Sequence, residues 1–394
     1  MPDADELRRW LVADLEARGQ LSAEWRDAFM SVPRHAFIPD TVWWHDRELD
    51  SRYDLVPLRR SDDPGRWMEL AYSDDFVVTQ VNDGQPAGPE GRGDDVTSSA
   101  SMPTIMALML GHLETRPGQS VLEIGTGTGY NAALLAHHLG VETVTTIEVD
   151  AELADRARRA LIGIGFGDVT VITGDGAEGH TPRAPYDRVI STAAVQRVPY
   201  SWVAQVRQGG RLVTPWGTDY ENGNLLALDV DGDGIGIGRI VDTASFMWLR
   251  EQRSHKARVG KDVPDEDQAE VRSSELHPYR VAGHRDVCTA IGLRVPGCHC
   301  RYRPADEDDP EGTLWLIDPE SRSWASLRHH PERPGPYRVR QLGPRMLFDE
   351  VESAYRWWVD LGEPTVERWR FTVSSEGQRV WLPGEHGECI WSAG

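Results

Sequence analysis

Seven residues, Glu-Ile-Gly-Thr-Gly-Thr-Gly from Glu123 to Gly129, have the composition of a ligand-binding loop. They follow a short apolar run and precede a helical pattern, so we expect a strand, a tight turn and a helix. Glycines permit the turn and let a ligand approach the backbone, while the helix N-terminus offers unpaired N–H groups. The loop residues expected to bind a cofactor are Gly125, Thr126, Gly127, Thr128 and Gly129.

Acidic residues stand at the ends of three successive predicted strands. Glu123, just before the first glycine, would repel a pyrophosphate and suits a cationic amino group, such as that of S-adenosylmethionine. Glu148, followed by Val149, ends the next strand and can accept both ribose hydroxyls. Asp175-Gly176 ends the third strand, where adenine would lie. A single glycine motif is weak, but the ordered set favours a methyl-donor site over a domain whose turns bind no cofactor.

The elements that must position these residues alternate along the chain. This alternation predicts an α/β fold with a Rossmann-like, doubly wound parallel sheet, as in class I methyltransferases. Strands are expected at 120–125, 144–149, 169–174 and 187–192, and helices at 103–113, 130–140 and 151–165. Thr192, at the end of the last of these strands, either lines the methyl channel or is an ordinary strand-end threonine.

Three segments follow from this pattern. Residues 1–100 are expected to form a helical N-terminal segment with substrate loops, and the Gly/Pro/Asp stretch 82–95 is predicted to be a mobile loop. Residues 101–241 form the predicted cofactor-binding core, ending in a hairpin at 225–241. Residues 242–394 are predicted to be an additional α+β domain.

Composition limits the classes of function. The net charge of -21 argues against a nucleic-acid partner, and no apolar run is long enough to span a membrane. The four cysteines are too few for a disulfide scaffold, and the first residues lack a secretory signal, so a cytoplasmic location is expected. Cys298-His299-Cys300 has metal-capable side chains, but neighbours in an extended segment point apart, so no metal is expected. The oligomeric state stays open.

Beyond these patterns, the sequence resembles the protein-L-isoaspartate O-methyltransferases over roughly Trp10 to Gly217. The resemblance rests on AFMSVPRHAFIP at 28–39, VLEIGTGTGYNAALL at 121–135 and the stretch Gly174 to Gly217. It implies an S-adenosylmethionine-dependent enzyme that esterifies a carboxylate and releases S-adenosylhomocysteine.

The resemblance also implies a substrate-side hydroxyl at Ser101, two residues before Pro103. The surrounding text, VTSSASMP, departs from the family pattern and adds Thr97 and Ser99, so the role could belong to Ser99 instead. Without the resemblance, such a hydroxyl cluster is a common loop or helix-cap signature.

The segment after residue 242 is a further departure, expected to have no counterpart in the repair enzymes. Extended actinobacterial relatives resemble enzymes that methylate one aspartate of a macrocyclic ribosomal peptide, a graspetide or a lanthipeptide, with collapse of the ester to an aspartimide or isoaspartate. That is the leading hypothesis, with a modified precursor peptide as partner. The alternatives are isoaspartate repair and a non-catalytic precursor-binding scaffold. Side chains of the extension that could grip a substrate are Trp315, Trp324, Arg338, Arg340, Trp357 and Trp358.

Overall fold

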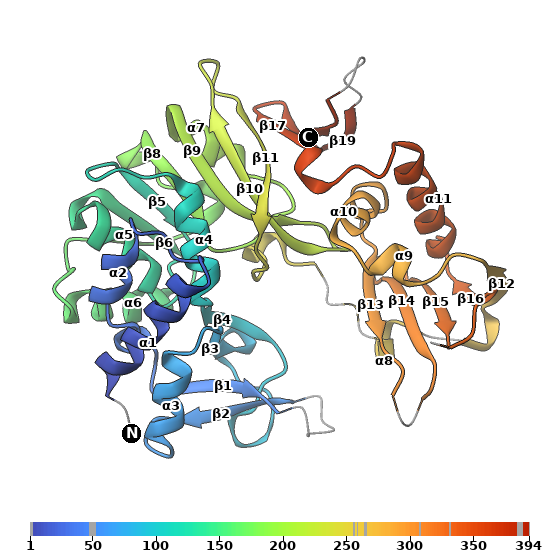
Figure 1. Ribbon diagram of the computed structural model, residues 1–394, viewed down its shortest axis with the longest axis horizontal. Coiled ribbons are helices and arrows are strands. Elements are labelled where there is room, and N and C mark those ends of the chain that lie inside the picture. The colour runs from blue at the N-terminus through green and yellow to red at the C-terminus, as the bar shows by residue number, and fades with distance from the viewer. Residues whose placement is uncertain are drawn as a thin grey trace. The chain divides into compact units, whose positions relative to one another are not determined.

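The computed structural model describes residues 3–46, 53–254, 257, 259–263, 266–306, 309–330, 332–383 and 389–393. The chain divides into two compact units (Figure 1). Unit 1 comprises Met1–Ala193, Pro199–Thr214 and Ala227–Gly236, and unit 2 comprises Ala194–Val198, Pro215–Leu226 and Ile237–Gly394. The chain enters unit 2 for the last time at Ile237, close to the predicted boundary near residue 242.

A parallel sheet forms the centre of unit 1. Its strands are β5 (Val121–Ile124), β6 (Val144–Glu148), β7 (Thr170–Thr173), β8 (Tyr186–Ser191) and β9 (Val206–Gly217), in the order β9-β8-β5-β6-β7. The chain runs from β5 outward in one direction and then returns to β5's other side through β8. Ligands of doubly wound sheets bind at the carboxyl edge at such a reversal, which here is the end of β5.

Helices follow the strands as the sequence pattern predicts. They are α4 (Pro103–Leu113), α5 (Tyr130–Leu139), α6 (Ala151–Gly163) and the short α7 (Tyr200–Ala204). Helix α5 is made mostly of buried Ala and Leu side chains and ends at Gly140, whose φ is 109°. Helix α6 begins at Asp150, whose carboxylate accepts from the N–H groups of Glu152 and Leu153 at 2.9 and 3.2 Å. The predicted doubly wound α/β core is confirmed.

The N-terminal segment contains more strand than the sequence predicted. It begins with α1 (Ala4–Ala17), α2 (Arg26–Ser31) and the 3-10 turn η1 (Arg34–Phe37). An antiparallel sheet in the order β2-β1-β3-β4 then follows, with α3 (Pro64–Ala71) between β2 and β3. Its strands are β1 (Thr41–His45), β2 (Leu55–Arg59), β3 (Val77–Val81) and β4 (Val96–Ala100).

The Gly/Pro/Asp stretch between β3 and β4 has a defined conformation rather than that of an open loop. It contains two 3-10 turns, η2 (Asn82–Gly84) and η3 (Pro89–Gly91). The Asn82 amide donates to the Asp94 carboxylate at 2.6 Å, and the Asn82 N–H donates to the Asp95 carbonyl at 2.8 Å. These bonds close the base of the excursion, so the predicted mobile loop is held at both ends.

Unit 2 is an α+β region, as predicted. Strands β10 (Asn222–Val230) and β11 (Gly236–Thr243) are the arms of the predicted hairpin, of which Ala227–Gly236 belongs to unit 1 and the remainder to unit 2. The turn is fixed by Asp231, whose carboxylate accepts from the N–H groups of Asp233 and Ile235, both at 2.9 Å. A five-stranded antiparallel sheet follows in the order β12-β16-β15-β14-β13. Its strands are β12 (Glu270–Ser274), β13 (His299–Arg303), β14 (Gly312–Asp318), β15 (Ser323–His329) and β16 (Tyr337–Leu342).

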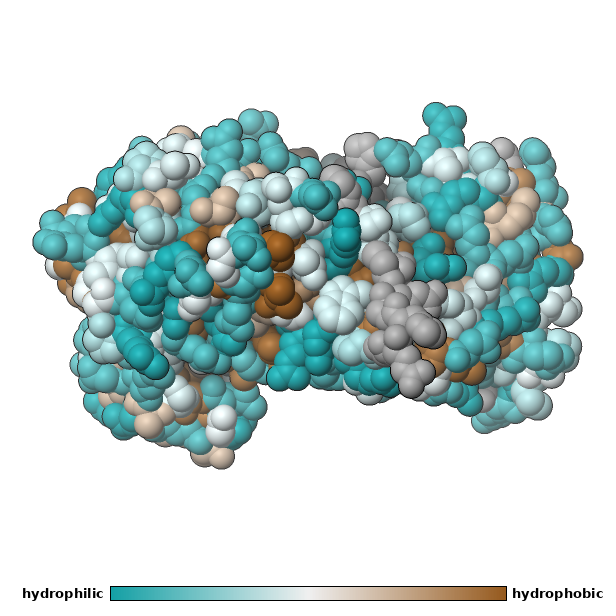
Figure 2. All heavy atoms as spheres, turned by 90° about the horizontal axis from the view of Figure 1, so that it is seen from above, coloured by the Kyte–Doolittle hydropathy of each residue, from teal (hydrophilic) through white to brown (hydrophobic). Residues whose placement is uncertain are grey.

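Helices and a second group of strands complete unit 2. The helices are α8 (Val259–Asp262), α9 (Tyr279–Ala282), α10 (Arg285–Arg294) and α11 (Leu347–Asp360), and α11 packs against β14, β15 and β16. Strands β17 (Arg370–Ser374), β18 (Gly377–Trp381) and β19 (Cys389–Ala393) continue from β11 in the order β11-β17-β18-β19. Hydrophilic side chains dominate the face seen in Figure 2. No helix within the described ranges is long and apolar enough to cross a membrane.

Candidate active site

The glycine loop, Gly125 to Gly129, lies at the carboxyl end of β5 and has a backbone conformation that depends on glycine. Gly125, Gly127 and Gly129 have φ values of 89°, 53° and 89°, which side chains rarely adopt. A Cβ atom at Gly125 would lie 2.9 Å from the Thr192 hydroxyl, and one at Gly129 would lie 3.1 Å from the Ala157 Cβ. The loop therefore requires glycine at both positions, and it leaves the backbone of Gly125 and Gly127 partly exposed.

Glu123 is fully buried directly beneath this loop. Its carboxylate accepts from the Asn131 amide at 2.7 Å and from the Thr146 hydroxyl at 2.6 Å. Burial raises the pKa of this carboxyl to about 7, against the lowering effect of both hydrogen bonds, and Glu148 adds a smaller raising contribution. The predicted contact with a cofactor amino group stays a prediction.

Glu148 ends β6 and faces the same loop. Its carboxylate accepts from the Gly127 N–H at 2.8 Å and from the Asp150 N–H at 3.1 Å. Carboxylate oxygens have further lone pairs, so these bonds orient the group without using up its capacity to accept ribose hydroxyls. Val149, the neighbour predicted with it, is 42% exposed and lies at the same edge.

The remaining predicted cofactor residues mainly support the loop. Asp175 accepts from the Ala177 N–H at 2.9 Å, which starts the 3-10 turn η5 (Gly176–Glu178) and buries Gly176. Thr192 donates through its hydroxyl to the Gly125 carbonyl at 2.6 Å, and the Thr126 hydroxyl bonds Thr146 at 2.7 Å. The predicted roles of Asp175 toward adenine and of Thr192 toward the methyl group stay predictions.

The hydroxyl-bearing segment, Thr97 to Ser101, lies against the glycine loop along β4. A Cβ at Gly127 would be 3.7 Å from the Ser99 carbonyl and 4.0 Å from the Ser98 hydroxyl. Thr97 is the least available of the three predicted substrate residues, because its buried hydroxyl donates to Gln80 at 2.9 Å and accepts from the Asp83 N–H at 3.0 Å. Ser99 and Ser101 are half-buried.

Two positioning residues escaped the sequence analysis. The fully buried Arg34 guanidinium donates to the carbonyls of Ala100 at 3.4 Å and Ser101 at 3.0 Å, and also to carbonyls of Ala71, Ser73 and Asp75. Burial lowers its pKa to about 10, so it remains a cation at neutral pH. Gln80, which holds Thr97, donates to Asp150 at 2.9 Å and thereby ties the hydroxyl segment to the end of β6. Arg34 lies in the motif at 28–39, but nothing in its spacing identifies five carbonyl partners.

A cavity of about 290 Å³ is lined by residues of both the N-terminal motif at 28–39 and the glycine loop. Its walls include Ala36 to Pro39 on one side, Gly127 and Thr128 on another, and Thr79 between them. Arg156 and Arg159 of α6 complete the lining. The N-terminal signature and the glycine loop, separated by almost 90 residues, thus face one space.

These features fit S-adenosylmethionine. A loop that a Cβ would obstruct lies over a buried carboxylate, and a second carboxylate is fixed at the next strand end. Hydroxyl side chains of β4 lie beside the loop, and Arg156 and Arg159 line the neighbouring cavity. The two carboxylates and the glycine loop fit a nucleoside cofactor that carries a cationic amino group.

Comparison with known proteins agrees with this geometry. Residues 81–254 match the family model described as protein-L-isoaspartate(D-aspartate) O-methyltransferase. A protein-L-isoaspartate O-methyltransferase of Ignicoccus hospitalis is 36% identical over 250 residues, covering 63% of this chain and 100% of its own. Protein-L-isoaspartate O-methyltransferase 2 of Archaeoglobus fulgidus is 33% identical over 256 residues, covering 65% of this chain and 98% of its own.

A solved structure of a protein-L-isoaspartate O-methyltransferase shares the fold with a TM-score of 0.53 at 19% identity. It covers 96% of this chain and 100% of its own, so the alignment extends across most of the region after residue 242. The expectation that this region has no counterpart in proteins of that name is therefore wrong. The curated relatives agree with the geometry of the glycine loop. The chain belongs to the protein-L-isoaspartate O-methyltransferase family, whose members are S-adenosylmethionine-dependent carboxyl O-methyltransferases.

Proposed function

We propose that this enzyme methylates the side-chain carboxylate of isoaspartyl residues in a protein or peptide substrate. The observation that carries the proposal is that the hydroxyl-bearing segment lies beside the cofactor loop. The Ser99 carbonyl and the Ser98 hydroxyl are 3.7 and 4.0 Å from the position that a Cβ atom on Gly127 would occupy. Family membership supports the same substrate class.

The reaction requires little acid–base catalysis from the protein. The substrate carboxylate has a reference pKa of about 4 and is ionised at neutral pH. The bound cofactor supplies a methyl group on a sulfonium, which is already an activated leaving group. The protein's task is to place the carboxylate in line and to exclude water. Hydroxyl donors at Ser99 and Ser101 suit this task, because a strong cationic clamp would stabilise the charged ground state more than the charge-neutralising transition state.

A peptide panel tests the proposal. Short peptides with one isoaspartate, and the same peptides with L-aspartate, are incubated with enzyme and radiolabelled cofactor. We expect base-labile methyl incorporation into the isoaspartyl peptides and little into the aspartyl ones. Equal labelling of both sets, or labelling of neither, contradicts the proposal.

A second candidate is methylation of an L-aspartate in a macrocyclic ribosomal peptide. The observation that favours it is the extent of unit 2, most of which lies outside the matched residues 81–254. In this reaction the next residue's amide nitrogen attacks the methyl ester, the C–N bond of an aspartimide forms, and the ester C–O bond breaks with release of methanol. Hydrolysis of the imide would give isoaspartate.

A further inference from the structure

The antiparallel sheet of unit 2 has two different faces. Leu314, Leu316, Leu327 and Val339 are buried, and α11 packs against β14 to β16. Side chains alternate along strands, so the residues between these positions lie on the opposite face. That face carries Arg301 on β13, Trp315 on β14, Ser326 on β15 and Arg340 on β16, which the pairing registers place opposite one another in one row. Beside this row, Ile317 and Trp324 of the same face are buried with Ala257, and Trp315 packs against that cluster.

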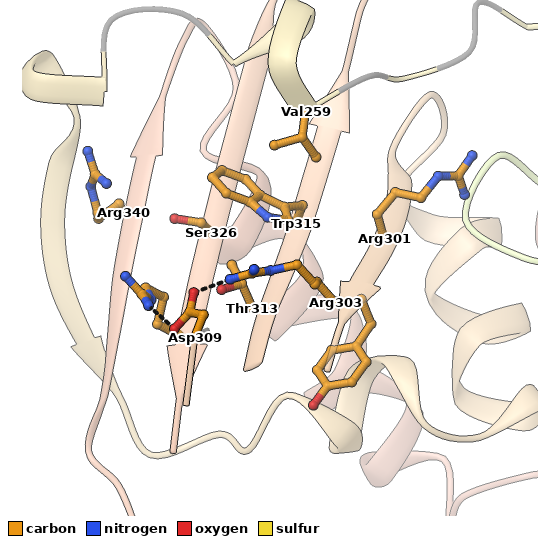
Figure 3. Close-up of a pocket in the computed structure, with 10 residues that line it drawn as sticks. Val259, Arg301, Arg303, Asp309, Thr313, Trp315, Ser326 and Arg340 are labelled. Carbon is orange, nitrogen blue, oxygen red and sulfur yellow. Dashed lines mark hydrogen bonds and ion pairs between the residues drawn. The ribbon is translucent and has the colours of Figure 1, made fainter. Parts of the chain in front are cut away.

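A second row lies two residues further along each strand. Arg303 pairs with Thr313, Thr313 with Arg328, and Arg328 with Arg338. We call the set Arg301, Arg303, Arg328, Arg338, Arg340 and Trp315 the arginine face. All of these residues except Arg338 line a cavity of about 430 Å³, with Trp315 in its floor (Figure 3).

Two of these arginines form ion pairs within the protein. Asp309 accepts from Arg303 and from Arg328, the latter at 2.8 Å, and Glu311 bonds Arg328 at 3.0 Å. Figure 3 shows Arg303 reaching Asp309 at one end of the cavity. Arg301 and Arg340 project from opposite sides of Trp315. The Arg301 guanidinium donates to the neighbouring Cys300 carbonyl at 3.2 Å, and the Arg340 guanidinium lies over the Trp324 ring, 5.8 Å from its centroid.

Four arginines around one cavity are unexpected on a chain with a net charge of -21. Guanidinium groups bind carboxylates in a bidentate manner, and a tryptophan floor adds apolar contact area for an extended backbone. We propose that the arginine face is a binding site for an acidic peptide segment of the substrate, distant in sequence from the residue that is methylated. The proposal rests on the proposed function, in that the substrate is a protein or peptide.

A peptide fits the face better than a nucleic acid does. Asp309 and Glu311 stand at the rim of the cavity and would repel a continuous phosphate backbone, whereas carboxylates of a peptide can be spaced to avoid them.

Charge reversal tests the site with a matched control. Arg301→Glu/Arg340→Glu changes the arginine face, whereas Arg356→Glu/Arg379→Glu makes the same charge change at exposed side chains of α11 and β18. The probe is a fluorescein-labelled octaglutamate peptide, with octaglutamine as its neutral counterpart, measured by anisotropy on the full chain. We expect the first variant to raise the Kd for octaglutamate at least about tenfold and the control to change it by much less.

The outcomes separate this proposal from the proposed function. Unchanged octaglutamate binding in the first variant, equal losses in both variants, or equal binding of octaglutamine overturns the binding site. Tighter binding of an eight-residue deoxythymidylate, lost in the same variant, replaces the peptide with a nucleic acid. Methylation of isoaspartyl peptides is measured in parallel. Its absence alongside the expected octaglutamate result counts against the proposed function only, and melting temperatures of all variants identify any that do not fold.

Discussion

At the scale of single residues, two glutamates at one sheet edge have different environments. Glu148 ends β6 with its carboxylate oriented by two backbone N–H groups, while Glu123 is enclosed by Asn131 and Thr146. We expect the first to accept further hydrogen bonds from a ligand. The second is held near its ionisation midpoint at neutral pH, because burial opposes its charge.

Removing the Glu148 carboxylate should weaken cofactor binding. We expect Glu148→Ala to cost about 1.5–3 kcal/mol of S-adenosylmethionine affinity, the range for hydrogen bonds to a charged group. Glu142→Ala, at an exposed glutamate just before β6, is the control and should leave affinity unchanged. Calorimetry measures both, and an unaltered Kd in Glu148→Ala would remove this residue from the ribose role.

Glu123 should make stability depend on pH. Its folded-state pKa of about 7 lies above the ordinary value of 4.5, so the folded protein binds more protons than the unfolded chain between these values. The favourable contribution of the protonated group is complete below pH 4.5 and is lost as the pH rises through about 7. Glutamine at this position stays neutral, and it can donate to Thr146 if the Thr126–Thr146 hydrogen bond reverses direction.

We therefore expect the melting temperature of Glu123→Gln to rise relative to wild type between about pH 5 and pH 8, without cofactor. Differential scanning calorimetry at several pH values measures this difference. A difference that is constant with pH would contradict the buried, easily protonated carboxyl. Cofactor affinity provides a second readout, because loss of the negative charge should weaken binding if Glu123 faces the amino group.

The serines of the hydroxyl segment should affect turnover rather than folding. Ser101→Ala is expected to slow methyl transfer while cofactor affinity and melting temperature stay at wild-type values, because its backbone carbonyl still accepts from Arg34. Single-turnover labelling measures the rate. Normal turnover in Ser101→Ala with a slow Ser99→Ala would assign the orienting hydroxyl to Ser99, and normal turnover in both would exclude the hydroxyl mechanism.

At the scale of elements, prediction succeeded where the sequence signal is local. Short apolar runs identified β5 to β8, and the helices between them were bounded by features such as Asp150 and Gly140. The sheet of β1 to β4 was not predicted, because its pairing joins segments separated by α3 and by the excursion at 82–95. Arg34 was recognised as part of a motif, yet its five partners depend on how distant segments fold together.

The glycine loop offers a test at this scale. Gly125→Ala places a Cβ 2.9 Å from the Thr192 hydroxyl on a backbone with φ of 89°. We expect a strained loop, with a loss of about 1–3 kcal/mol in stability and weaker cofactor binding. Gly111→Ala in α4 meets no atom within 4 Å, so it should be neutral or stabilising by about 0.4–1 kcal/mol. Thermal unfolding that ranks the two variants in the opposite order would contradict this account of the loop.

At the scale of the whole molecule, the sequence indicated a second folded region but not which of its side chains are buried and which line a cavity. Trp324 and Trp358, offered as substrate contacts, are buried in unit 2, and the Trp358 indole donates to the Pro364 carbonyl at 3.1 Å. Trp315 and Arg340 line the cavity of the arginine face. Trp324 lies on the same face of the sheet, with its ring centroid 6.0 Å from that of Trp315, but it is buried beside Ala257 and Ile317. Composition alone could not separate these groups, because burial of a tryptophan depends on which distant segments pack over it.

The order of substrate processing discriminates between the two candidate functions. Ordering a flexible chain costs roughly 1–2 kcal/mol per residue, and a closed macrocycle has already lost much of that freedom. If the substrate is a macrocyclic peptide, we expect L-aspartate to be methylated only after ring closure, followed by loss of methanol to a product one water lighter than the starting peptide.

Mass spectrometry of a cyclised precursor, its linear form and a short isoaspartyl peptide measures this directly. A methyl ester that never decays would contradict the imide step, and equal turnover of the linear form would contradict the ring requirement. Preferred turnover of the isoaspartyl peptide would establish the repair-type specificity that the family relationship favours.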